Sequence, residues 1–282
     1  MEQYELNNGT TIPSLGLGTF TIKPDDAENA VNHALQDGYR MIDTANIYMN
    51  EKAVGRGMKK SGIARNEIYL STKLWPSVYS KASQAIDETL KRLDTDYIDL
   101  LFLHQPSGDV LGAWHAMEQA VRDGKVKSLG LSDFSRSQIQ EVLDHCEIKP
   151  AVLQIEAHPY FDQAAMSAWL KPYGIRIMSW YPLGHGDHTL IEEPVFTSLA
   201  EKYHKSNAQI ILRWHIQMGF IVIPGSKNPE HIQDNLNIFN FELTADDMRL
   251  IATIHKNKSY LNIPGFVQKA MYLYRPNFNH QK

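Results

Sequence analysis

Short apolar runs alternate along the chain with longer segments in which apolar residues recur at helical spacing. In the segment from Asp25 to Gln36, Ala27, Val31 and Leu35 fall on one side. This spacing predicts an amphipathic helix, and Gly38 follows it in the position of a C-cap. The next apolar run then predicts a buried strand, so the chain switches between the two periodicities.

The alternation repeats to the end of the chain. Strands are predicted near residues 15–19, 40–43, 67–72, 97–103, 126–131, 151–155, 175–180 and 220–223. Helices are predicted near residues 25–36, 49–60, 80–92, 110–122, 136–145, 162–170, 194–218 (in two pieces) and 229–237. A hairpin over residues 3–13, with its turn at Asn7-Asn8-Gly9, precedes these units. Eight strand–helix units predict a (β/α)8 TIM barrel with an N-terminal β-hairpin.

A doubly wound open sheet is the alternative architecture. Such a sheet normally carries a G-x-G-x-x-G turn between its first strand and first helix. Here Gly16-x-Gly18 is followed by Thr-Phe-Thr, without a third glycine or an immediate helix, which disfavours that architecture. The 282 residues suit one barrel of the usual ~250 residues, and no linker-like tract interrupts them. We therefore expect a single domain over residues 1–282.

Composition and charge narrow the function classes. The net charge is −4 and no basic stripe is visible, so nucleic acid and anionic membranes are poor candidates as partners. Cys146 is the only cysteine, which excludes an internal disulfide and fits a reducing compartment. The N-terminus lacks an apolar signal core, and no apolar run approaches the ~18 residues of a membrane span. We expect a cytoplasmic protein.

Four polar residues stand at predicted strand ends: Asp43, Tyr48, Lys73 and His104. The carboxyl ends of barrel strands converge on one face, so these side chains are expected to meet there. A carboxylate, a phenol, an ammonium and an imidazole in one pocket can transfer protons. Taken singly, each has an ordinary alternative: a helix cap, core packing, a surface lysine and a satisfied histidine. Their joint placement favours a catalytic site.

Many ordered segments resemble the aldo-keto reductase family, particularly prokaryotic carbonyl reductases similar to 2,5-diketo-gluconate reductase. The matching segments are Leu15-Gly16-Leu17-Gly18-Thr19, Gly38-Tyr39-Arg40-Met41-Ile42-Asp43-Thr44-Ala45, Thr72-Lys73-Leu74-Trp75, Asp96-Tyr97-Ile98-Asp99-Leu100, His104-x-Pro106, Gln154-x-Glu156-x-His158-Pro159-Tyr160, Trp180-Tyr181-Pro182-Leu183-Gly184 and Ile223-Pro224-x-Ser226. The likeness covers nearly the whole chain. It implies a TIM barrel that binds a nicotinamide dinucleotide across its mouth and reduces aldehydes and ketones.

The resemblance also implies a role for each of the four polar residues. Tyr48 is the proton donor, and Lys73 is expected to lower the pKa of its phenol. Asp43 neutralises and orients Lys73, and His104 binds and orients the substrate carbonyl. The other residues implied in the substrate pocket are Phe20 and Trp75. An alternative function is a cofactor-bound regulatory protein with little turnover, because the family includes channel-associated subunits.

For the cofactor, the resemblance implies a cradle built from many strand ends. Its residues are Thr19, Asp43, Ser132, Asp133, Gln154, Trp180, Leu183, Gly184, Ser226, Lys227, Asn228, His231, Asp234 and Asn235. Ser132 and Gln154 would bind the carboxamide, and Trp180 would stack on the ring. Asp133 stands where the family usually has Asn, and it could receive the carboxamide NH2 or cap the following helix.

The adenosine end departs from the family pattern in a way that bears on cofactor choice. Gly225 and His231 occupy positions where members that prefer NADPH usually carry Lys and Arg. Both cations serve the 2′-phosphate, and a mostly neutral His lacks the bidentate fork of Arg. We therefore expect NADPH and NADH both to be usable.

The physiological substrate cannot be read from the sequence. A C-terminal substrate loop is expected to form an adaptable apolar rim from Phe266, Met271, Tyr272, Tyr274 and Phe278, with Gln105 and Pro106 on the same side. The His185-x-Asp187-His188 sequence is too unspecific for a metal site, so we expect no metal. We expect a monomer that acts on a small carbonyl compound.

Overall fold

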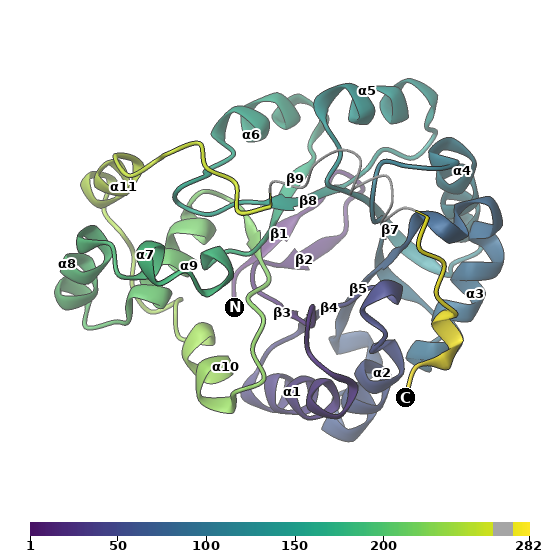
Figure 1. Cartoon of the computed structure of the whole chain (residues 1–282), viewed down its shortest axis with the longest axis horizontal. Helices are drawn as coiled ribbons and strands as arrows, with labels where there is room; N and C mark the ends of the chain where they lie inside the picture. The colour runs from purple at the N-terminus through teal and green to yellow at the C-terminus, as the bar shows by residue number, and fades with distance from the viewer. Residues whose placement is uncertain (262–272) are drawn as a thin grey trace.

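The computed structural model describes residues 1–261 and 273–282. Its centre is a parallel sheet whose strands follow one another in chain order, surrounded by helices (Figure 1). The strands are β3 (Leu17–Gly18), β4 (Met41–Asp43), β5 (Tyr69–Leu74), β6 (Ile98–Leu103), β7 (Val126–Ser132), β8 (Val152–Glu156), β9 (Arg176–Trp180) and β10 (Ile221–Val222). Parallel bridges from Leu15 to Val222 and from Gly18 to Gly225 join the two ends of the sheet. The predicted (β/α)8 barrel is thus confirmed.

The outer layer also follows the predicted order. It contains α1 (Pro24–Asp37), η1 (Asn46–Tyr48), α2 (Glu51–Ser61), η2 (Arg65–Glu67), η3 (Pro76–Lys81), α3 (Ala82–Leu93), α4 (Val110–Arg122), α5 (Arg136–His145), α6 (Ala164–Leu170), η4 (Lys171–Tyr173), η5 (Gly184–Gly186), α7 (His188–Ile191), α8 (Pro194–Tyr203), α9 (Asn207–Gln217), α10 (Pro229–Leu236), α11 (Ala245–Ala252) and η6 (Phe278–His280). The region predicted as two pieces is α8 and α9. The sequence analysis missed α7 and α11, although α11 begins with a capping box between Thr244 and Asp247.

Two glycines explain where α1 ends and how the barrel closes. Gly38 has a φ of 110° and donates its N–H to the carbonyls of Ala34 and Leu35, so it ends α1 as predicted. At the closure, a Cβ on Gly18 would lie 2.6 Å from the Ile223 carbonyl oxygen. Only glycine allows β3 to approach the β10 end so closely.

The predicted hairpin, formed by β1 (Gln3–Glu5) and β2 (Thr11–Pro13), covers the amino-terminal end of the barrel. Ile12 belongs to the same buried apolar cluster as Phe102 and Met178 of the barrel strands. The Asn8 amide donates to the Lys127 carbonyl and to the Ser128 hydroxyl, near the start of β7. This end is therefore closed, which leaves the carboxyl ends of the strands for a site. Within the described ranges, every helix is too short or too polar to cross a membrane.

Candidate active site

The structure brings the four predicted catalytic residues together at the carboxyl ends of the strands. Asp43 ends β4, Lys73 lies near the end of β5, Tyr48 ends η1 and His104 follows β6. The Lys73 Nζ lies 2.6 Å from Asp43 Oδ2 and 4.9 Å from the centre of the Tyr48 ring. The Tyr48 and His104 ring centres are 5.7 Å apart, with the rings edge-on. An acid, a cation, an anion and an imidazole thus share one small volume.

Lys73 and Asp43 form a buried and well-paired ion pair. Their side chains are 0% and 2% exposed. Lys73 Nζ also donates to the Thr44 carbonyl at 2.7 Å, while Asp43 Oδ1 accepts from Ser71 Oγ at 2.7 Å and from Gln154 Nε2 at 3.1 Å. These extra hydrogen bonds offset the desolvation of the two charges. Sequence reasoning missed Ser71, although strand alternation puts it on the same face of β5 as Lys73.

Burial governs the protonation of the catalytic candidates Tyr48, Lys73 and His104. Burial, followed by the Asp43 and Asp133 charges, holds the pKa of Tyr48 well above its ordinary value. The pKa of Tyr48 is therefore raised and not lowered as expected from Lys73, because desolvation of the phenolate dominates. Burial also lowers the pKa of Lys73, against the opposing effect of Asp43. Burial and the Lys73 charge hold the pKa of His104 well below its usual value, so its imidazole is neutral at pH 7.

Aromatic rings define the substrate side of the site. The His104 ring lies between Tyr48 and Trp75, 5.2 Å from the Trp75 ring. His104 Nδ1 is buried and has no hydrogen-bond partner among the described residues. Phe20 is 47% exposed, and its ring centre lies 5.0 Å from that of Tyr48. The aromatic rings of Phe20 and Trp75 thus lie beside the phenol of Tyr48 and the imidazole of His104. Their role in a substrate pocket stays a prediction.

The predicted nicotinamide residues occupy neighbouring strand ends. Ser132 ends β7, Gln154 lies in β8 and Trp180 ends β9. Ser132 and Gln154 are buried, whereas Trp180 is partly exposed. The Gln154 amide donates to Asp43 and to Met178 Sδ, so it joins the cradle to the buried ion pair.

Asp133 does not cap the following helix. Ser135 caps α5 and forms a capping box with Gln138. The Asp133 carboxylate instead accepts from Trp180 Nε1 at 2.9 Å and from Gln105 Nε2 at 2.8 Å. Sequence reasoning did not foresee this arrangement, because its two donors come from the ends of different strands.

The expected residues of the adenosine end lie around the start of α10. Asn228 caps this helix by accepting from the Glu230 N–H, and its own N–H donates to Ser226 Oγ at 3.1 Å. Lys227 is exposed and pairs with Asp26 at 3.1 Å. The remaining expected residues are Gly225, His231 and Asp234, which are exposed, and Asn235, which is buried.

Three further expected cofactor residues, Thr19, Leu183 and Gly184, lie closer to the barrel. The Thr19 hydroxyl donates to the Asp43 carbonyl at 3.0 Å, which ties β3 to β4. Leu183 is partly exposed and precedes η5, where Gly184 takes a φ of 60°. A Cβ on Gly184 would lie 2.8 Å from Leu190, so a side chain there would crowd the loop.

Comparison with known proteins decides the family. A model of the aldo/keto reductase family matches residues 14–256. The chain belongs to the aldo/keto reductase family. A glyoxal reductase from Bacillus subtilis (strain 168) is 40% identical over 261 residues, which cover 91% of this chain and 94% of that protein. The methylglyoxal reductase of Escherichia coli (strain K12) is 35% identical over 257 residues, covering 90% and 94%.

Solved structures of aldo-keto reductases share the fold. The crystal structure of an aldo/keto reductase from Brucella melitensis has a TM-score of 0.87 and 42% identity, covering 90% of this chain and 97% of that chain. A Bombyx mori aldo-keto reductase in complex with NADP has a TM-score of 0.89 and 33% identity, covering 94% and 96%. This aldo-keto reductase is therefore an oxidoreductase that uses a nicotinamide cofactor and acts on small carbonyl compounds.

The C-terminal tail of the aldo-keto reductase is only partly described. Phe266, Met271 and Tyr272 lie outside the described residues. Tyr274 is exposed, whereas Phe278 is buried in η6. Next to Phe278, Asn279 accepts from Arg92 on α3, and the Gln281 side chain accepts from the Lys52 N–H on α2. Phe278 thus belongs to an anchor of the tail on α2 and α3, a role that the sequence analysis did not foresee.

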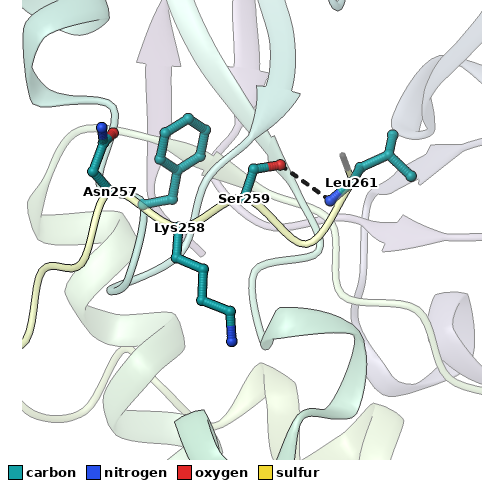
Figure 2. Close-up of a pocket in the computed structure, with 5 residues that line it drawn as sticks. Asn257, Lys258, Ser259 and Leu261 are labelled. Atoms are coloured by element: carbon teal, nitrogen blue, oxygen red, sulfur yellow. Dashed lines mark hydrogen bonds between the residues drawn. The ribbon is translucent and has the colours of Figure 1, made fainter. Parts of the chain in front are cut away.

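A hollow of about 540 Å³ lies where the chain leaves β8 and meets the tail. Figure 2 shows the residues that line it: Phe161, Asn257, Lys258, Ser259 and Leu261. Ser259 Oγ accepts from the Leu261 N–H and donates to Glu156 Oε2. None of the four catalytic candidates lines this hollow. Among the described residues, no group of three or more His, Cys, Asp or Glu is arranged to hold a metal ion.

Proposed function

We propose that this aldo-keto reductase reduces aldehydes and ketones with Tyr48 as the proton donor. The convergence of Tyr48, Lys73, Asp43 and His104 at the barrel mouth carries this proposal. Reduction of a carbonyl needs a hydride at carbon and a proton at oxygen. The nicotinamide supplies the hydride when it is bound.

The residues of the site divide the proton chemistry between them. Tyr48 is a neutral phenol at pH 7, so its O–H is available to protonate the developing alkoxide. As the phenol gives up its proton, the Lys73 ammonium stabilises the phenolate. The Lys73 Nζ lies 4.9 Å from the centre of the Tyr48 ring, which brings the cation near the phenol for this attraction. The neutral imidazole of His104 donates a hydrogen bond that orients the substrate oxygen.

The residues present fit a nicotinamide at the barrel mouth. The indole of Trp180 is partly exposed and held by its N–H, which suits a stacking surface. Ser132, Asp133 and Gln154 present polar groups at adjacent strand ends for the carboxamide. Thr19, Leu183 and Gly184 would line the path of the dinucleotide toward α10. There Ser226, Lys227, Asn228, His231, Asp234 and Asn235 would hold the adenosine end.

We propose that both NADPH and NADH are used. Lys227 is the one cation among the adenosine-end residues, and it is exposed and paired with Asp26. A single screened cation gives a modest preference for the 2′-phosphate. Steady-state KM and kcat for both cofactors test this. A preference above about a thousandfold, equivalent to roughly 4 kcal/mol, would contradict the proposal.

The substrates we propose are small aldehydes of the glyoxal and methylglyoxal type. Two relatives similar along more than nine-tenths of their length carry those names. A panel of short dicarbonyls, longer aliphatic aldehydes and aromatic aldehydes would rank kcat/KM by loss of reduced-nicotinamide absorbance. Equal rates across the panel would instead favour an unselective reductase.

A Tyr48→Phe variant tests the central role. We expect reduction to fall by at least about a hundredfold while the dissociation constant of NADPH changes little. Retained activity would exclude Tyr48 as the acid. If the unaltered protein binds NADPH but turns over no aldehyde, the regulatory alternative is favoured. We further propose a monomeric, single-domain cytoplasmic enzyme, which sedimentation and cell fractionation would check.

A further inference from the structure

Asp133 links four strand ends at the place proposed for the nicotinamide. Its carboxylate accepts from Trp180 at the end of β9 and from Gln105 just after β6. Its backbone N–H donates to the Gln154 carbonyl of β8 at 3.0 Å, and Asp133 itself follows β7. The residue takes a φ of 62°, a left-handed conformation that Asp tolerates better than most side chains. The carboxylate is thus held in place from several sides.

Both carboxylate oxygens are used as acceptors, and both donors are neutral. Neither the Trp180 indole nor the Gln105 amide carries a charge, so the negative charge of Asp133 is not cancelled by its direct partners. The charged and titratable groups that interact with Asp133 from the surrounding elements are Lys73 on β5, Glu156 on β8 and Tyr48 on η1. Lys73 is itself paired with Asp43 at 2.6 Å.

We propose that Asp133 is a charged positioning residue that fixes the Trp180 and Gln105 side chains and favours binding of the oxidised, cationic nicotinamide over the reduced, neutral one. This inference rests on the proposed function, because it requires the nicotinamide to stack on Trp180. An anion next to the ring attracts the pyridinium and leaves the dihydropyridine nearly unaffected. By that asymmetry, Asp133 makes the bound reduced cofactor a stronger hydride donor.

The charge of the Asp133 carboxylate should depend on pH, because the side chain is buried. Burial raises the pKa of Asp133 to about 6, while the hydrogen bonds from Trp180 and Gln105 lower it. The carboxylate is therefore mostly ionised at pH 7.5 and mostly neutral at pH 5. Protonation would also remove one acceptor from the pair that holds Trp180 and Gln105.

An Asp133→Asn variant separates the effect of the negative charge from the effect of the hydrogen bonds to Trp180 and Gln105, which we call the tether. The Asn carbonyl can accept from Trp180, and its NH2 can donate to Gln105 once the Gln105 amide is reversed, so both hydrogen bonds survive without the charge. Asp144→Asn is the matched control, since Asp144 is an exposed carboxylate on α5 that also accepts from a glutamine at 2.7 Å. Asp133→Leu removes the tether as well.

Two measurements decide the matter. Dissociation constants for NADP+ and NADPH are measured at pH 7.5 by calorimetry, without substrate. In the Asp133→Asn variant, the ratio of Kd for NADP+ to Kd for NADPH should rise about tenfold, from one screened charge near the ring. It should stay within twofold in the Asp144→Asn control. The second measurement is the tryptophan fluorescence of the cofactor-free proteins between pH 4.5 and 8, where a transition near pH 6 should vanish in Asp133→Asn and in Trp180→Phe.

The possible failures are distinguishable. An unchanged ratio in Asp133→Asn would overturn the charge role, and a fluorescence transition that persists in that variant would show that another group titrates beside Trp180. In Asp133→Leu, both cofactors should bind more weakly, because the indole loses its anchor. Equal affinities of Asp133→Leu and unaltered protein would overturn the tether. If the unaltered protein binds neither dinucleotide, the proposed function itself fails.

Discussion

Replacement of Lys73 by methionine tests how much the buried Lys73–Asp43 ion pair contributes to the stability of the barrel. The change removes the ammonium and keeps much of the side-chain volume. Among the described residues, it leaves the Asp43 carboxylate, which is 2% exposed, with only the Ser71 hydroxyl and the Gln154 amide as side-chain partners. Loss of one partner from a buried ion pair costs about 3–5 kcal/mol, because an uncompensated charge remains in a poorly solvated place. We expect a loss of that size in the free energy of unfolding at pH 7.

Urea unfolding followed by circular dichroism measures this loss without any need for activity. A double-mutant cycle with Asp43→Leu isolates the pair. The double variant should be more stable than the sum of the single losses predicts, by about 2 kcal/mol, because it buries no unpaired charge.

Lys127→Met is the matched control. Lys127 is 47% exposed and pairs with Asp99 at 2.9 Å, and Asp99 keeps Arg65 as a second partner. This control should lose less than about 1 kcal/mol. If Lys73→Met lost no more than the control, or if the cycle were additive, the buried pair would not contribute as its geometry indicates.

Three further substitutions test other parts of the structure. Gly18→Ala should destabilise the barrel by about 2 kcal/mol or more, seen as a lower Tm, because its Cβ would lie 2.6 Å from the Ile223 oxygen. The pKa of Asp133 rises from 3.8 to about 6 on folding. As the pH rises, the unfolded chain therefore loses this proton before the folded protein does. The free energy of unfolding should consequently fall between pH 4 and 6, by at most about 3 kcal/mol. Urea midpoints across that range should show the fall, and Asp133→Asn should lack it. Phe278→Ala should cost about 3 kcal/mol by urea unfolding while aldehyde reduction persists, because Phe278 anchors the tail outside the site.

The barrel was predictable because its strands and helices have different periodicities. Gly38 marked the end of α1, and the long apolar run before His104 marked β6. The missed elements are short or depend on one cap. α7 is a single turn capped by Asp187, and α11 is set by the reciprocal bonds of Thr244 and Asp247. Capping interactions of this kind contribute little to a prediction that is based on the spacing of apolar residues.

The site was predictable to the level of which residues meet, and no further. Parallel strands deliver Asp43 and Lys73 to the same face, so their proximity follows from strand ends alone. Protonation does not follow, because the pKa of Tyr48 depends on how completely the surrounding loops exclude water. The tether from Asp133 to Trp180 and Gln105 could not be predicted, because the ends of three strands separated in sequence must be placed to within hydrogen-bond distance.

Burial of the Lys73–Asp43 pair costs free energy of desolvation, but it also gives the site the protonation states that the proposed reduction needs. With the phenol of Tyr48 and the imidazole of His104 both neutral near pH 7, each has a proton to offer to a carbonyl oxygen. In a more open site the pKa of His104 would return toward its ordinary value, so the imidazole would become protonated at a higher pH. Water would also weaken the attraction between Lys73 and a phenolate, because it screens that attraction. Lys73 can be buried because the Asp43 carboxylate and the Thr44 carbonyl accept hydrogen bonds from its ammonium. In the proposed mechanism, the pair therefore lets a cation persist beside Tyr48 where the fold excludes water.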